Sequence, residues 1–174
     1  MRYIVLLRGV NVGGKNKLPM AAFRTRLEAK GFENVTSYIQ SGNIGLDSKL
    51  EAKQVKYLIE QLLDEEYQYR VPVLVLPQSA LHSLIKAHPH TNLETDIKYL
   101  HFTLLHASPS EAQRKCFGDL EIVGEEFLCG DSCVFLHLPN GYGRAKLTNG
   151  FVEGQLKVIA TTRNYKTIQK LVDL

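Results

Sequence analysis

Residues 2–17 of the chain, RYIVLLRGVNVGGKNK, decide how its first half folds. The apolar run over residues 3–7 predicts a β-strand that is buried on both faces. A glycine-rich loop follows it and carries Arg8, Lys15 and Lys17. Glycines let the backbone turn and present its N–H groups, and with positive side chains nearby such a loop attracts anions. We therefore expect an anion to bind where this strand ends.

The chain after this loop has the pattern of a ferredoxin-like unit. Apolar periodicity and β-branched runs predict, in order, a helix over 19–30, strands over 35–39 and 43–47, a helix over 51–67 and a strand over 71–76. In the β-α-β-β-α-β fold, the end of the first strand and the turn between the second and third strands share one edge of the sheet. We expect the turn with Ser41 and Asn43 to lie beside the glycine-rich loop.

The second half of the chain has a looser α+β pattern. It predicts, in order, a strand over 99–106, a helix over 108–117, strands over 120–123, 126–129 and 133–138, a loop over 140–144 and helices over 151–156 and 164–171. A short helix is expected to begin at Pro77. We therefore divide the chain into a ferredoxin-like half over 1–78, a helical connection over 79–98 and a second α+β half over 99–174.

Composition narrows the class of protein. With 174 residues and 44% hydrophobic content, the chain is long enough to bury a sizeable core. Its 21 Lys and Arg residues exceed its 18 Asp and Glu residues by only three, which argues against a general nucleic-acid or membrane-surface coat. No apolar run approaches the roughly 20 residues that span a bilayer. The three cysteines and the lack of an apolar leader indicate a cytoplasmic protein.

The loop over 9–16, GVNVGGKN, nearly matches the phosphate-binding motif G-x-x-x-x-G-K-[ST]. Asn16 lacks the hydroxyl that would hold Mg²⁺, and the next helix is predicted to begin only at Pro19. A looser anion nest without metal needs only the glycine N–H groups with Arg8, Lys15 and Lys17. The alternative is a connection whose glycines serve turn geometry and whose lysines are solvated. The sequence leaves both open.

A second polar segment, TTRN over 161–164, precedes the last predicted helix. Its threonine hydroxyls are expected to cap the free N–H groups of that helix. Alternatively, the positive helix end and Arg163 make a second anion contact, aided by Arg144, Lys146 and Asn149.

The sequence predicts no metal site and identifies no catalytic group. Cys129, Cys133 and His137 are four positions apart, but a hairpin would not place all three on one face. The other histidines match no metal-binding motif. No acid–base pair can be identified, so no reaction and no cofactor are assigned.

Four ordered motifs resemble the bacterial domain-of-unknown-function family 1697 (DUF1697). They are LLRGVNVGG over 6–14, YIQSGN over 38–43, YG with KL over 142–147, and TTRN over 161–164. The resemblance implies a cytoplasmic α+β protein made of two ferredoxin-like halves, with antiparallel sheets and helices packed on them, and with no assigned activity. Two residues depart from the family pattern: Tyr165 stands where tryptophan is more usual, and Gly45 where a larger apolar residue is usual.

Three hypotheses for the function follow. The first is binding of an anionic or phosphorylated small molecule or nucleotide; the second is binding of single-stranded nucleic acid through basic residues and aromatic residues such as Tyr38 and Tyr142. The third is a structural or homo-oligomeric protein in which the polar motifs are buried hydrogen-bonders. The candidate ligand-binding residues are Arg8, Asn11, Gly13, Gly14, Lys15, Lys17, Ser41, Asn43, Lys146, Arg163 and Asn164.

Overall fold

The structure, a computed structural model, describes residues 1–91 and 94–174, and in these residues the strands form two four-stranded antiparallel sheets. Each sheet belongs to one compact unit: the first comprises Met1–His82 with Lys170–Leu174, and the second comprises Ser83–Gln169. The predicted connection over 79–98 includes residues 92 and 93, which lie outside the described residues. Among the described residues, no helix has the length and apolar character needed to cross a membrane.

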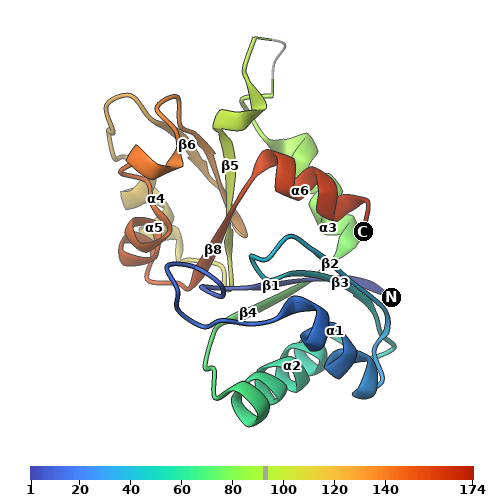
Figure 1. Ribbon diagram of the computed structural model, residues 1–174. Coiled ribbons are helices and arrows are strands. Elements are labelled where there is room, and N and C mark those ends of the chain that lie inside the picture. The colour runs from blue at the N-terminus through green and yellow to red at the C-terminus, as the bar shows by residue number, and fades with distance from the viewer. Residues whose placement is uncertain (92–93) are drawn as a thin grey trace. The chain divides into compact units, whose positions relative to one another are not determined.

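The first unit has the ferredoxin-like topology predicted from the sequence. Its strands follow the spatial order β2-β3-β1-β4, and each is antiparallel to its neighbours. Its elements are β1 (Arg2–Leu7), α1 (Met20–Ala29), β2 (Glu33–Tyr38), β3 (Asn43–Asp47), α2 (Ala52–Tyr67) and β4 (Val73–Pro77), as drawn in Figure 1.

The core of the first unit lies between the sheet and its two helices. Alternate residues of β1, among them Val5 and Leu7, are fully buried and point toward α1 and α2. Phe23 of α1 and Ile59 of α2 are also fully buried in this cluster. Figure 1 shows both helices on the same face of the sheet. This layering leaves the strand ends, and the loops that follow them, at the rim of the unit.

The second unit repeats this topology, which confirms the predicted α+β class with two ferredoxin-like halves. Its sheet has the order β6-β7-β5-β8, and Leu105, Val134 and Leu136 of this sheet share a core with α4 and α5. The remaining elements of the chain are α3 (Gln78–Ala87), η1 (Ile97–Tyr99), β5 (Leu100–Leu105), α4 (Glu111–Gly118), β6 (Glu126–Cys129), β7 (Cys133–His137), η2 (Tyr142–Arg144), α5 (Asn149–Leu156), β8 (Ala160–Asn164) and α6 (Tyr165–Val172).

Two details of the second half differ from the sequence prediction. The expected strand over 120–123 is wrong: the segment ends in a turn at Gly124, whose φ is +78°, and Val123 is fully exposed. The edge of the sheet is taken by β6 instead, which pairs with β7. The threonines of residues 161–164, which are expected to cap the last helix, instead lie in β8, which pairs with β5. β-Branched threonines suit an edge strand as well as a helix cap.

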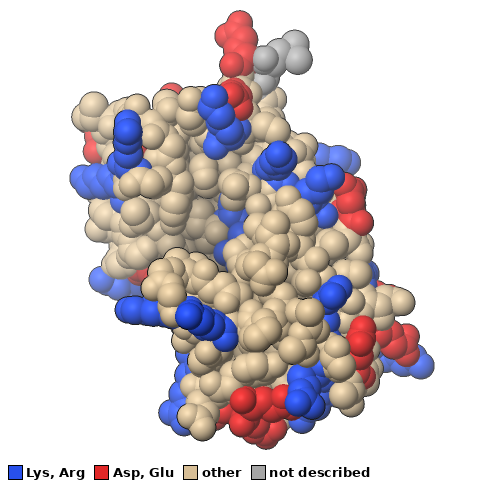
Figure 2. All heavy atoms as spheres, viewed as in Figure 1, with Lys and Arg blue, Asp and Glu red and all other residues tan. Residues whose placement is uncertain are grey.

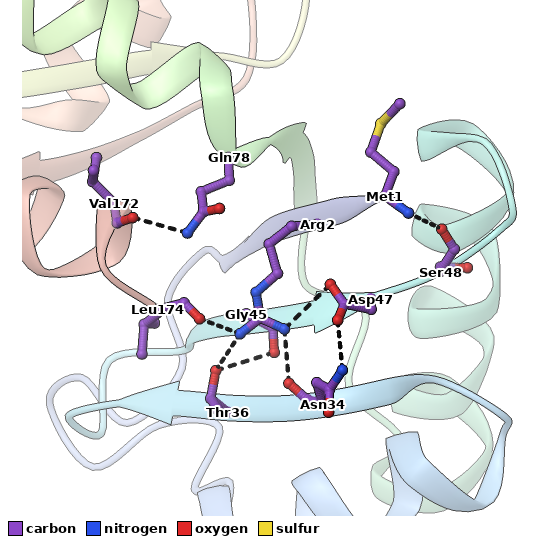
Figure 3. Close-up of polar contacts among 10 residues, drawn as sticks. All are labelled: Met1, Arg2, Asn34, Thr36, Gly45, Asp47, Ser48, Gln78, Val172 and Leu174. Atoms are coloured by element: carbon purple, nitrogen blue, oxygen red, sulfur yellow. Dashed lines mark hydrogen bonds and ion pairs between the residues drawn. The ribbon is translucent and has the colours of Figure 1, made fainter.

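On the face of the first sheet opposite α1 and α2, Arg2 of β1 contacts β2, β3 and the C-terminal residue (Figure 3). Its guanidinium donates to the Thr36 hydroxyl at 2.9 Å and to the Asn34 carbonyl at 2.8 Å, and it also donates to the backbone oxygen of Leu174. A Cβ on Gly45 would lie 2.7 Å from the Arg2 Nη2 atom. The arginine therefore occupies the space that a larger residue at position 45 would fill.

Replacing Gly45 with valine should displace the Arg2 guanidinium and break its contacts. We expect the free energy of unfolding to fall by about 1–3 kcal/mol, as is usual when a close-packed site is overfilled. Urea denaturation of the purified protein measures it. Gly154→Ala is the matched control, because a Cβ there meets nothing within 4 Å and the residue lies in α5. A Gly45→Val protein as stable as wild type would contradict this account.

Candidate functional site

The glycine-rich loop is a small, ordered hairpin, which we call the basic hairpin and define as residues 8–18. Val12 and Lys15 form a β-bridge, and the Lys15 N–H donates to the Val12 carbonyl at 3.1 Å. Gly13 and Gly14 at its tip have φ angles of +58° and +75°. A two-residue turn with positive φ at both central positions strongly favours glycine. The two glycines therefore form the tight turn at the tip of the hairpin.

Asn11 fixes the base of the basic hairpin. Its carboxamide nitrogen donates to the Leu18 carbonyl at 2.9 Å and to the Gln40 carbonyl at 2.7 Å, while its oxygen accepts from the Leu18 N–H at 2.8 Å. Asn16 adds a bond from its side chain to the Gly9 carbonyl at 3.0 Å. One side chain thus joins both ends of the hairpin and the turn that precedes β3.

That turn, over residues 39–43, packs directly against the hairpin, as the ferredoxin-like topology predicts. The Gly42 carbonyl accepts from the Leu7 N–H at 2.8 Å, and a Cβ on Gly42 would lie 2.6 Å from a methyl group of Val10. Asn43 is fully buried, and its side chain donates to the Ser41 hydroxyl at 2.8 Å. Ser41 and Asn43 therefore hold the turn in shape beside the hairpin.

The charge of this region is uniformly positive. Lys15 and Lys17 are exposed and Arg8 is half-buried, and the sequence over 8–18 and 39–43 contains no Asp or Glu. Among the described residues, the exposed amides of Gly13 and Gly14 donate to no other backbone carbonyl. Backbone N–H groups can bind an anion and ammonium groups can neutralise its charge, whereas nothing in these two segments is an obvious general base. The arrangement is therefore suited to binding an anion rather than to acid–base catalysis.

The remaining candidate residues lie in the second unit, and their local roles differ from one another. Arg163, in β8, donates to the Thr161 hydroxyl at 2.8 Å and to the Thr162 carbonyl at 2.9 Å, and burial lowers its pKa to about 10. Asn164 caps α6, because its side-chain oxygen accepts from the Thr167 N–H at 2.8 Å. Lys146 is exposed, with its ammonium group 5.7 Å from the centre of the Phe151 ring.

A chain of polar side chains that the sequence motifs did not reveal joins β5 and β8 of the second sheet. The hydroxyls of Thr103 and Thr162 lie 2.9 Å apart, and the Thr162 hydroxyl donates to the Asn149 side chain at 3.0 Å. The Tyr142 hydroxyl accepts from the Asn149 N–H at 2.8 Å, and the Tyr142 ring stacks on His101 at 5.3 Å. Tyr142 and Asn149 are thus engaged in holding η2 and the start of α5 to the sheet.

Removal of the Asn11 side chain should loosen the basic hairpin. Asn11→Gly suits the test because Asn11 has a φ of +54°, which glycine adopts without strain. We expect the free energy of unfolding to fall by about 1–3 kcal/mol, since the buried backbone of Leu18 and the carbonyl of Gln40 lose their hydrogen bonds. Chemical denaturation measures this loss, and Lys15→Ala at the exposed tip should change it by less than about 0.5 kcal/mol. Equal losses in the two variants would argue against this role of Asn11.

His101 should make the stability of the protein depend on pH. Burial lowers the pKa of His101 from its ordinary value of 6.5. As the pH falls through that value, the unfolded chain therefore binds more protons than the folded one, and the free energy of unfolding decreases. One such group contributes at most about 1.4 kcal/mol per pH unit. Denaturation between about pH 7 and 5 should show a shallower decrease for His101→Phe than for wild type, and equal decreases in the two proteins would contradict this account.

Comparison with known proteins places this architecture in a family. The solved structure of the conserved bacterial protein SP0830 from Streptococcus pneumoniae is similar, with a TM-score of 0.77 and 25% sequence identity over 99% of this chain and 97% of that chain. No curated protein matches the chain. A family model described as "Protein of unknown function (DUF1697)" matches residues 1–135. The chain belongs to the DUF1697 family.

Proposed function

We propose that the protein binds a phosphorylated small molecule or nucleotide at the basic hairpin. The observation that carries this proposal is that the Gly13–Gly14 tip, with amides directed to no other backbone group in the described residues, is held on a fixed base by Asn11. Successive backbone N–H groups in a turn can form a concave site that binds anions. A cytoplasmic location belongs to the same proposal, and the odd number of cysteines supports it.

The fixed base matters because it lowers the cost of binding. A flexible glycine loop would lose conformational freedom when it closed on a ligand, and that loss would weaken affinity. In the basic hairpin, the bonds of Asn11 and Asn16 have already ordered the backbone. Lys15 and Lys17 then add charge next to the tip without a neighbouring carboxylate in the segment to compete for it. The two glycine amides and the two lysines make a site of the size and charge that suit a single phosphate group.

The charge distribution supports a small anion over a long nucleic acid. Within each unit, on the face drawn in Figure 2, Lys and Arg side chains lie in small separate groups, with Asp and Glu near several of them. The net charge of the whole chain is only +3. Proteins that follow a nucleic-acid backbone usually present a continuous basic surface. The structural alternative is supported for Asn11 and Asn43, whose hydrogen bonds serve the fold, but it does not account for the exposed Lys15 and Lys17.

Calorimetric titration of the full chain with inorganic phosphate, AMP and ADP tests the proposal. We expect saturable binding of at least one probe, and we expect a Lys15→Ala, Lys17→Ala double variant to bind it at least about tenfold more weakly, because charge-assisted hydrogen bonds are lost. A Lys49→Ala, Lys53→Ala double variant is the matched control, since both residues are exposed lysines of the first unit.

The outcomes separate the hypotheses. Absence of binding by wild type, or equal binding by the two double variants, would overturn the proposal. Tight binding of a single-stranded oligonucleotide that weakens steeply with salt, without binding of the small probes, would instead favour the nucleic-acid alternative.

A further inference from the structure

One end of the second sheet brings together two imidazoles and a carboxylate. Glu126 begins β6 and His137 ends β7, and the two residues are directly paired across the hairpin, so their side chains lie on the same face. The His137 Nδ1 atom lies 2.9 Å from the Glu126 Oε2 atom. His90, from the segment after α3, places its Nδ1 atom 3.2 Å from that same oxygen. One ligand atom from each of the three residues lies within 4.8 Å of the other two.

His90 is held in this position by its buried neighbour His88. The His88 side chain is only 2% exposed and packs edge-on against Phe102, with ring centres 4.9 Å apart. Its Nδ1 atom accepts from the His90 N–H at 3.4 Å, and its carbonyl accepts from the Thr91 hydroxyl at 2.9 Å. Two elements of the fold, an anchored turn and a strand hairpin, therefore position the three side chains.

The donor set and its spacing suit a transition-metal ion. Imidazole nitrogen and carboxylate oxygen are usual ligands of Zn²⁺, which binds them at about 2.0–2.2 Å. Two such ligands at a tetrahedral angle are roughly 3.4 Å apart, close to the 2.9 and 3.2 Å found between Glu126 and the two histidines. Among the described residues, this is the group of three or more His, Cys, Asp or Glu side chains whose ligand atoms converge in this way.

We propose that His90, Glu126 and His137 bind one divalent transition-metal ion of the Zn²⁺ type. Imidazole ligands select such ions over Mg²⁺ and Ca²⁺, which prefer all-oxygen sites. Three protein ligands leave a fourth position for water, and the exposure of Glu126, whose side chain is 62% accessible, keeps the site open to solvent. This site lies in the second unit and does not depend on anion binding at the basic hairpin.

The same geometry could also exist without metal, as a carboxylate that accepts hydrogen bonds from two imidazoles. Such an exposed pair contributes little to stability and requires no ion. The two interpretations differ in stoichiometry and selectivity. A metal site takes up one Zn²⁺ per chain and responds to loss of either histidine, whereas a hydrogen-bonded cluster takes up none.

The test is titration of the chelator-treated full chain with ZnCl₂ by calorimetry, and with CoCl₂ by visible absorption. We expect one equivalent of Zn²⁺ or Co²⁺ to bind per chain. The bound Co²⁺ should show a visible spectrum typical of a low coordination number, and MgCl₂ should not bind. His137→Ala and Glu126→Gln should each weaken Zn²⁺ binding by at least about 100-fold, more than is usual for a residue outside the ligand set. Glu126→Gln keeps the shape of the side chain, and Glu126 is exposed, so folding should be retained.

His82→Ala is the matched control, because it removes an exposed histidine outside the cluster and should leave Zn²⁺ affinity unchanged. The proposal is overturned if wild type shows no saturable binding of Zn²⁺. It is also overturned if His137→Ala and Glu126→Gln bind Zn²⁺ as wild type does, or if His82→Ala loses as much affinity as they do, since the ion would then be bound elsewhere.

Discussion

The candidate anion site depends on the hydrogen bonds of the Asn11 carboxamide. Three hydrogen bonds from one side chain join the two ends of the basic hairpin to the turn before β3. Without them, a segment with glycines at positions 9, 13 and 14 would be free to sample many conformations. With them, the hairpin becomes a fixed extension of a sheet whose central strand, β1, is almost wholly buried. Because the base of the hairpin is ordered, its exposed tip can bind a ligand specifically.

The sequence predicted the first unit well because its local patterns and its topology agree. Hydrophobic periodicity located α1 and α2, and β3 was placed at its observed bounds. The second unit was harder to predict. The apolar residues over 120–123 resemble a strand, but β6 already occupies the sheet edge with which they could have paired. β8 was missed for the opposite reason: its polar sequence, ATTRN, is stabilised as a strand only by pairing with β5. Tertiary pairing decided both cases.

In the candidate site, too, the sequence predicted the features that follow from topology but not the contacts between side chains and distant backbone. The proximity of the glycine-rich loop and the Ser41 turn followed from ferredoxin-like topology alone. The roles of Asn11 and Asn43 did not, because a carboxamide reveals its partners only when the backbone is placed around it. The cluster of His90, Glu126 and His137 was also out of reach, since its members form no contiguous motif and meet through a strand pairing and a turn.

The central claim is that the tip of the basic hairpin receives an anion through its backbone amides. Nuclear magnetic resonance tests it most directly, by following every backbone N–H signal while inorganic phosphate or ADP is added to the ¹⁵N-labelled protein. The account predicts that the amide signals of Gly13 and Gly14 move most and saturate together. Saturating shifts confined to other parts of the chain, or no shifts at the tip, would contradict it.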